Sequence, residues 1–397
     1  MSIISDIRQI ESIGVSSGDF IDALTGLRGL AASWVMIFHL WLVLSGAPPV
    51  FIQLNQWPVD LTPLFSCGWV GVNIFFGLSG FLLFLPFAQL ILGFRERIYL
   101  GEYFKRRFLR LFPAYYLQIA ILFLLSFVGM HPPISIKILI FHFFMLQDFF
   151  PDQLINGVYW TLPVELSFYI ALPILFILLQ RIGWFYFMLA TIILVFSYRV
   201  FLFFLMQPVD ARNVKVVAMG QLPGRFDDFV FGMWSAFLYT KYGIFINGKT
   251  KLVSSLGIFV GFFGIVAMIY WFYFNGVSNY WSGEGNLVFF WNTITAVFIS
   301  ILIFSLALNG KIAQRLFSNK LMFLLGTISY SLYLWHLIVI AWLMTYFQAY
   351  PEYKSSLLWI CGIVMSVLLS AFSYWCIEYP FLKIRHATLV SQKMPIT

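Results

Sequence analysis

Four long stretches of this chain contain no Asp, Glu, Lys or Arg: Val70–Phe94, Phe112–Met130, Leu252–Phe274 and Leu287–Asn309. Uncharged apolar runs of about 18 or more residues are typical of helices that cross a bilayer. Only 10% of the 397 residues are charged, and the mean hydropathy is +0.89. Soluble globular domains contain about 25% charged residues. The sequence therefore predicts an all-α bundle that crosses the membrane several times.

The hydrophobic pattern predicts about ten transmembrane helices, near 27–46, 70–93, 112–130, 160–180, 183–206, 226–243, 252–275, 287–308, 321–347 and 355–378. The segment 135–149 is also apolar, but it is short, contains Lys137 and Asp148, and lies between prolines. We expect it to form an interfacial or re-entrant helix rather than a span. No fused soluble domain is expected, so 1–397 is interpreted as a single membrane domain.

Basic residues concentrate in the loop around 95–110, in the loop 311–320 and after residue 382. Loops rich in Lys and Arg stay in the cytoplasm, and only the ten-span arrangement places all three clusters there. We therefore expect cytoplasmic segments at 1–26 and 379–397 in a multi-pass protein of the cytoplasmic (inner) membrane. Because the net charge of +8 comes from these loops, it does not indicate nucleic-acid binding. No cleavable signal peptide is apparent, and Cys67, Cys361 and Cys376 lack metal-ligand spacing.

Titratable side chains inside apolar runs are costly to keep there, so each one is a candidate functional residue. His39 lies about 18 Å along the first predicted span from Leu27, toward the outer side. A histidine titrates near neutral pH and can act as a general base or nucleophile, although it can also simply hydrogen-bond a neighbouring helix. Glu165, at the outer end of the fourth span, can orient His39, bind an acceptor, or pair with Arg199 at similar depth.

Arg107 and Arg110 are three residues apart and share one helix face. Arginine is suited to paired recognition of phosphate oxygens, which here would belong to a nucleotide-bearing donor in the cytoplasm. The alternative is ordinary positive-inside charge, which is our interpretation of Lys105 and Arg106.

Two further groups of polar residues remain open in function. Ser329, Tyr333 and His336 form one helical stripe that either lines a site or joins helices. Arg225, Asp227 and Asp228 begin the sixth span, where carboxylates can receive a hydroxyl-rich acceptor or form a solvated helix start.

Six motifs in order resemble those of the acyltransferase-3 family of membrane O-acyltransferases, typified by bacterial enzymes that O-acetylate lipopolysaccharide O-antigens and exopolysaccharides. They are Leu24–Ala32 with His39, Gly68–Phe81, Arg107–Arg110 with Pro113, Tyr159–Tyr169, Gly326–His336 and Ile377–Pro380. Thr25 departs from the pattern, because the family usually has Asp there. The resemblance implies a catalytic His39 and use of acyl-CoA by Arg107 and Arg110.

We therefore expect an acyl-CoA-dependent O-acyltransferase, with acetyl as the expected group, that modifies a sugar hydroxyl of a cell-envelope glycan. The expected catalytic residues are His39 and Glu165, and Arg107 and Arg110 would hold the co-substrate. Acceptor binding is assigned to Trp160, Arg199, Asp228, Tyr333 and His336. No permanently bound cofactor, metal or nucleic acid is expected. The alternatives are a small lipophilic acceptor, such as a macrolide or lipid, and a transporter or flippase, which would give Arg107 and Arg110 no role.

Overall fold

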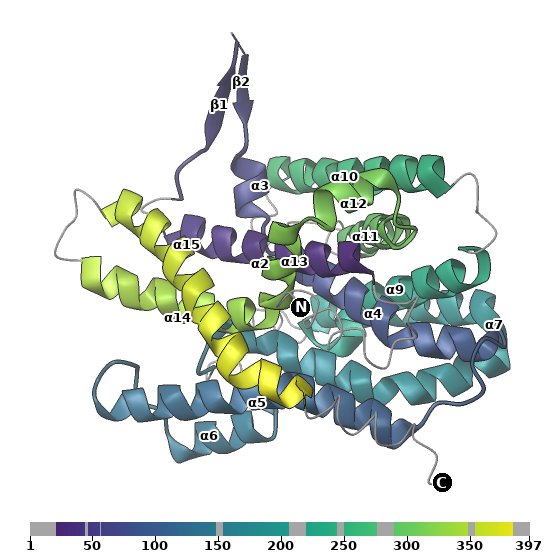
Figure 1. Ribbon diagram of the computed structural model, residues 1–397, viewed down its shortest axis with the longest axis horizontal. Coiled ribbons are helices and arrows are strands. Elements are labelled where there is room, and N and C mark those ends of the chain that lie inside the picture. The colour runs from purple at the N-terminus through teal and green to yellow at the C-terminus, as the bar shows by residue number, and fades with distance from the viewer. Residues whose placement is uncertain are drawn as a thin grey trace.

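The computed structural model describes residues 21–43, 47–55, 57–147, 154–205, 220–243, 250–275, 290–347 and 354–383. This part of the chain is a bundle of helices with one β-hairpin (Figure 1). Strands β1 (Phe51–Leu54) and β2 (Trp57–Asp60) pair antiparallel, with Leu54 opposite Trp57. The prediction of an all-α membrane fold is confirmed.

A helix lies at each of the ten predicted membrane segments. The helices are α2 (Asp22–Val43), α3 (Thr62–Ser66), α4 (Val70–Ile91), α5 (Leu100–Phe127), α6 (Ile136–Phe143), α7 (Thr161–Leu205), α9 (Leu222–Tyr242), α10 (Thr250–Phe274), α11 (Trp291–Ala307), α12 (Lys311–Phe317), α13 (Lys320–Thr327), α14 (Ser329–Tyr346) and α15 (Lys354–Ser373). A 3-10 turn (Gly157–Trp160) precedes α7, and a π-helical turn (Tyr374–Glu378) follows α15.

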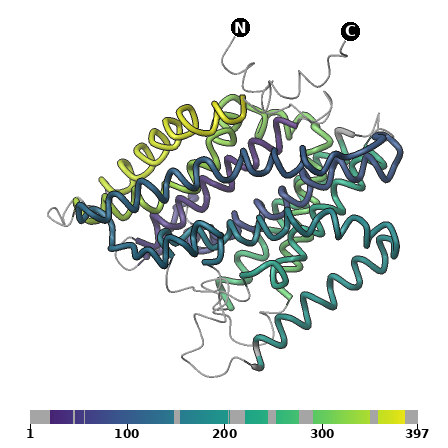
Figure 2. The backbone as a smooth tube through the Cα atoms, turned by 90° about the horizontal axis from the view of Figure 1, so that it is seen from below, coloured from purple at the N-terminus to yellow at the C-terminus, as the bar shows by residue number. Residues whose placement is uncertain are grey.

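Six of these helices are long and apolar enough to cross a membrane singly, and the bent pairs α11–α12 and α13–α14 raise the number to eight. Two features explain the difference from ten. Helix α7 contains two predicted spans, because it breaks at Gly183 (φ 74°, ψ 167°) and doubles back, as Figure 2 shows. Helix α9 carries charged residues in its first two turns. Helix α6 has eight residues, about 12 Å, and is too short to span, as expected.

Glycines allow the central helices to approach closely. A Cβ on Gly232 of α9 would lie 2.1 Å from the carbonyl oxygen of Gly77 in α4. A Cβ on Gly326 of α13 would lie 1.9 Å from the carbonyl oxygen of Thr25 in α2. Small residues at helix crossings replace side-chain bulk with backbone packing, which is a common means of association inside membranes. These crossings bring α4 against α9 and α2 against α13.

The outside of the bundle is apolar. Large side chains on α7, α10 and α15 are largely exposed, including Phe185 at 75%, Phe259 at 60% and Phe372 at 66%. In water such a surface would be unfavourable, but against lipid chains it carries no penalty. The exposure pattern therefore supports the membrane assignment.

Candidate active site

Two histidines from distant parts of the sequence meet inside the bundle. His39 of α2 and His336 of α14 lie with His39 Nδ1 and His336 Nε2 3.1 Å apart. The same Nδ1 is 3.0 Å from the Val35 carbonyl oxygen, and His336 Nδ1 is 2.9 Å from the Leu332 carbonyl oxygen. His336 is fully buried, whereas His39 is half-buried and borders a cavity. The structure thus places His336 behind His39, and not in the acceptor position that the sequence suggested.

The cavity beside His39 has a volume of about 200 Å³. Aromatic side chains form much of its wall, and Trp160 and Tyr333, both expected here, are among them. Its lining residues also include Phe38, Trp69 and Val72. Small-molecule sites are typically apolar with a few polar groups, as here, but they are larger, at about 300–1,000 Å³.

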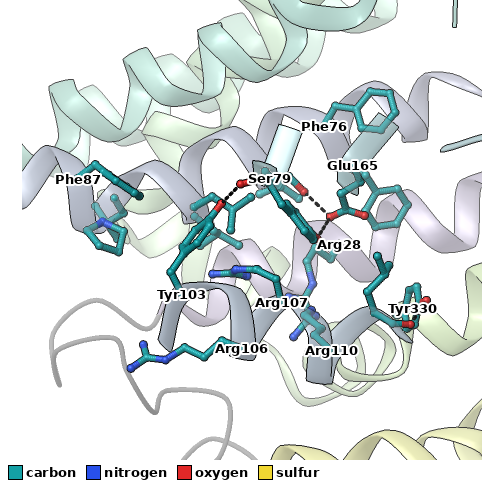
Figure 3. A pocket seen from close by; sticks show the side chains of 18 of the residues that line it. Arg28, Phe76, Ser79, Phe87, Tyr103, Arg106, Arg107, Arg110, Glu165 and Tyr330 are labelled. Atoms are coloured by element: carbon teal, nitrogen blue, oxygen red, sulfur yellow. Dashed lines mark hydrogen bonds between the residues drawn. The ribbon is translucent and has the colours of Figure 1, made fainter. Parts of the chain in front are cut away.

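A second cavity, of about 980 Å³, is lined by six arginines from α2, α5 and the loop 92–99: Arg28, Arg95, Arg97, Arg106, Arg107 and Arg110 (Figure 3). Glu102 and Glu165 also border it, but the arginines outnumber these two carboxylates, so the lining is positive. Lys105 is exposed and is not part of this lining, whereas Arg106 is. The interpretation of both residues as positive-inside charges stays a prediction.

Sequence reasoning did not single out Arg28, Arg95 or Arg97 as site residues. Arg95 and Arg97 looked like positive-inside charges, because nothing local in the sequence shows that their loop folds over a cavity. Arg28 had a usable signal, since it stands one residue into a predicted span. In the structure its Nη2 donates to the Gly326 carbonyl oxygen at 3.1 Å, which joins α2 to α13.

Arg107 is held between two aromatic rings. Its guanidinium carbon is 5.9 Å from the ring centre of Tyr103 and 6.0 Å from that of Tyr169. Its Nε has no hydrogen-bond partner within the described residues. Cation–π contacts fix the side chain while leaving guanidinium N–H groups for an anionic ligand.

Glu165 lines the arginine cavity and not the His39 cavity. Its Oε1 accepts hydrogen bonds from Ser79 at 2.9 Å and from Tyr169 at 2.5 Å (Figure 3). The expectations that it orients His39 or pairs with Arg199 therefore do not match this geometry. The reason is the helix face on which Glu165 lies. Its side chain contacts Ser79 of α4 and lines the cavity together with residues of α5, whereas Trp160, in the turn before α7, lines the His39 cavity.

Val72 and Tyr333 line both cavities. The Tyr333 hydroxyl donates to the Val158 carbonyl oxygen at 3.1 Å and accepts from Thr161 Oγ1 at 3.0 Å. Val72 and Tyr333 are therefore the residues that the arginine cavity and the His39 cavity share, and they form the wall between the two.

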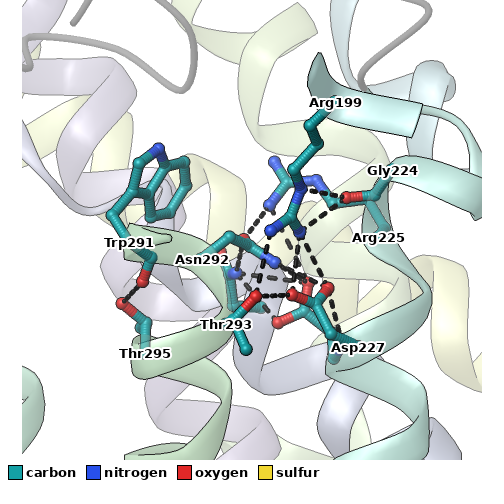
Figure 4. A network of polar contacts seen from close by, with 10 residues as sticks. Arg199, Gly224, Arg225, Asp227, Trp291, Asn292, Thr293 and Thr295 are labelled. Carbon is teal, nitrogen blue, oxygen red and sulfur yellow. Dashed lines mark hydrogen bonds and ion pairs between the residues drawn. The ribbon is translucent and has the colours of Figure 1, made fainter. Parts of the chain in front are cut away.

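Arg199 and Asp228 belong to a separate buried network that links α4, α7, α9 and α11 (Figure 4). Arg199 pairs with Asp227 at 2.8 Å. Asn73 and Asn292 donate to Asp228 at 3.0 and 3.2 Å. Neither Arg199 nor Asp228 lines either of the two cavities described above, so their assignment to the acceptor stays a prediction. The packing of the four helices provides the Arg199 guanidinium and the Asp228 carboxylate with hydrogen-bond partners inside the bundle.

The fold and site define a polytopic helical membrane protein with a positively charged internal cavity that adjoins a histidine pair. The chain belongs to the acyltransferase-3 family: the family's model, described as an acyltransferase domain, matches residues 21–375.

Similar proteins include the O-acetyltransferase OatA of Staphylococcus aureus (strain NCTC 8325 / PS 47), 24% identical over 95% of this chain. This chain spans only 59% of the length of OatA. Nodulation protein 10 of Rhizobium leguminosarum bv. viciae is 28% identical over 93% of this chain and 95% of its own length. A putative acetyltransferase, ORF330, of Acidianus two-tailed virus is 29% identical over 38% of this chain and 39% of its own. No solved structure matches the chain.

Proposed function

We propose that this protein is an acyl-CoA-dependent O-acyltransferase that transfers an acyl group, acetyl in the first instance, to a sugar hydroxyl of a cell-envelope polysaccharide. The observation that carries the proposal is the adjacency of the two cavities, with six arginines on one side and His39 on the other of a shared wall. Membership of the acyltransferase-3 family and the name of OatA support the reaction class.

The donor occupies the arginine cavity in this proposal. Coenzyme A carries phosphate groups at one end and the thioester at the other, and arginines bind phosphate through paired, charge-assisted hydrogen bonds. Arg107 and Arg110 hold the phosphates, and the acyl end extends past Ser79 toward Tyr333 and Val72, which also line the cavity. The basic loop 92–99 lies on the predicted cytoplasmic side of the inner membrane, so the donor enters from the cytoplasm.

His39 acts as the general base. It takes the proton of the acceptor hydroxyl while the oxygen attacks the thioester carbonyl carbon; the C–S bond breaks, and the sulfur leaves with coenzyme A. Transient attachment of the acyl group to His39 is the covalent version of the same transfer. The small volume of about 200 Å³ beside His39 favours a short acyl group.

The acceptor approaches from the outer side. Trp69, Trp160 and Phe38 offer flat apolar surfaces against which the apolar face of a sugar ring can pack. A lipopolysaccharide O-antigen is one acceptor of this class, and a macrolide or lipid is the second candidate because the same walls suit any apolar ring. A transporter would need no arginine cavity next to a histidine. We therefore rank the transporter below acyl transfer to a glycan and below acyl transfer to a macrolide or lipid.

The test is surface-glycan analysis by NMR and mass spectrometry in a deletion strain complemented with wild type, with His39→Ala, or with Arg107→Ala/Arg110→Ala. We expect an O-acyl signal that is lost in the deletion and restored only by wild type. Restoration by His39→Ala would refute the mechanism. An unchanged glycan, together with transfer to a lipid or small molecule, would favour the second acceptor class.

A further inference from the structure

The contacts of the histidine pair determine where its protons lie. A backbone carbonyl oxygen can only accept a hydrogen bond, so the Leu332 oxygen, 2.9 Å from His336 Nδ1, requires a proton on that nitrogen. The buried, neutral His336 then has an unprotonated Nε2. This Nε2 lies 3.1 Å from His39 Nδ1, which must therefore be the donor.

The second contact of His39 independently indicates that Nδ1 carries the proton. The Val35 carbonyl oxygen lies 3.0 Å from the same Nδ1 and also can only accept. Both acceptors thus require the proton of neutral His39 on Nδ1, shared between them. The other ring nitrogen, Nε2, keeps its lone pair on a side chain that borders the small cavity.

We propose that His336 is a positioning residue that holds His39 in the Nδ1-protonated tautomer, so that Nε2 is the nitrogen that takes the acceptor's proton. This inference rests on the proposed function for its catalytic consequence. In many hydrolases a carboxylate plays the orienting part for a histidine. Here the carboxylate that the sequence suggested, Glu165, lies in the other cavity, and a neutral imidazole occupies the orienting position.

The same contact stabilises the intermediate state of the reaction. When Nε2 receives the hydroxyl proton, His39 becomes an imidazolium whose Nδ1–H faces the lone pair of His336, a charge-assisted hydrogen bond. The proton then passes from Nε2 to the thiolate of the departing coenzyme A, which restores neutral His39 and balances the reaction. His336 keeps its own Nδ1 proton throughout.

Two substitutions distinguish a role of His336 in positioning His39 from a role in helix packing alone. His336→Phe keeps an aromatic ring but removes the acceptor atom, whereas His336→Gln places an amide oxygen near the position of Nε2. We expect His336→Phe to lower kcat about 100-fold, within the usual range for general-base catalysis, with an unchanged KM for acyl-CoA. His336→Gln should retain most of kcat. Full activity of His336→Phe, or equal loss in both variants when both keep the wild-type melting temperature, would overturn the proposal.

A spectroscopic measurement decides the tautomer without any substrate. The probe is protein labelled with ¹⁵N-histidine in lipid nanodiscs, with His39→Ala used to assign the signals of residue 39. We expect a protonated Nδ1 and an unprotonated Nε2 in wild type, and a smaller fraction of that tautomer in His336→Phe, in which the Val35 carbonyl oxygen is the one remaining acceptor of the two. An Nε2-protonated His39 in wild type would overturn the proposal. Because no acceptor is needed, an inactive wild type would refute the proposed function while the NMR result still decides the tautomer.

Discussion

Arg199 and Asp227 form an ion pair of 2.8 Å in which both side chains are completely buried. The guanidinium also donates to the Gly224 carbonyl oxygen at 2.8 Å and to Thr293 Oγ1 at 3.0 Å. The two residues belong to the second arm of α7 and to α9, and Thr293 belongs to α11. A buried ion pair is stabilising only when its remaining hydrogen-bonding groups are also satisfied, as they are here. These contacts of Arg199 therefore join α7, α9 and α11, three of the four helices of the network.

We predict that Arg199→Met lowers the free energy of unfolding by about 3–5 kcal/mol, because it leaves the Asp227 carboxylate buried without its cation. The double variant Arg199→Met/Asp227→Leu should recover part of that loss. Thermal unfolding in detergent measures both. Arg181→Met is the matched control, since Arg181 is an exposed arginine on the same helix. Equal melting temperatures for Arg199→Met and Arg181→Met would contradict the prediction.

Arg107→Ala should raise the KM for acyl-CoA about 10- to 100-fold with a smaller effect on kcat, because one charge-assisted hydrogen bond contributes about 1.5–3 kcal/mol. Initial rates at varied donor concentration provide the measurement. Lys105→Ala is the control, as Lys105 is nearby on α5 but exposed and outside the cavity lining. If both variants shift KM alike, general surface charge and not the cavity binds the donor.

Val72→Phe should reduce acyl transfer at least tenfold, because the larger side chain would fill the wall between the two cavities and misplace the acyl group. The affinity for desulfo-coenzyme A, measured by calorimetry, should change little, since the arginines that bind the phosphates lie elsewhere in the cavity. Val253→Phe, on a partly exposed face of α10, controls for added bulk. Wild-type transfer by Val72→Phe would show that the acyl group takes another route.

Gly232→Ala should destabilise the bundle by about 1–3 kcal/mol, the usual cost of overpacking. The added Cβ would lie 2.1 Å from the Gly77 carbonyl oxygen, so α4 and α9 must separate. Gly101→Ala in α5 meets nothing within 4 Å and should be neutral or slightly stabilising, since alanine favours helix. The melting temperatures of the two variants test this, and a loss in Gly101→Ala equal to that in Gly232→Ala would argue against tight packing as the cause.

Much of the fold could be predicted from hydrophobic length alone. The lengths of the apolar runs predict a helix at each of the ten segments. They also predict the break between the two arms of α7 and the short α6. The bends of α11–α12 (102°) and α13–α14 (71°) were not predicted. At the first bend Asn309 has a positive φ of 53°, a conformation that ends a helix. The hairpin formed by β1 and β2 was not predicted either.

The candidate site divides in the same way. Residue chemistry singled out His39, Arg107, Arg110, Trp160, Glu165 and Tyr333, and all six line one of the two cavities. Their catalytic and binding roles stay predictions. Depth along a helix placed Glu165 near His39, but depth carries no information about the direction in which a side chain points. For that reason the sequence did not show which residues contact Glu165, Arg199 and Asp228.

The sequence by itself determined that this chain is an all-α polytopic membrane protein and which costly polar groups it retains, because the transfer of each residue into lipid depends on the residue's own chemistry. Only the tertiary structure decided which of those groups meet. His39 and His336 are 297 residues apart in sequence, and their 3.1 Å contact exists because α2 and α14 pack with one particular rotation about their axes. Gly326 of α13, just before α14, also approaches Thr25 of α2 closely, and no single segment specifies such a contact between distant parts of the chain.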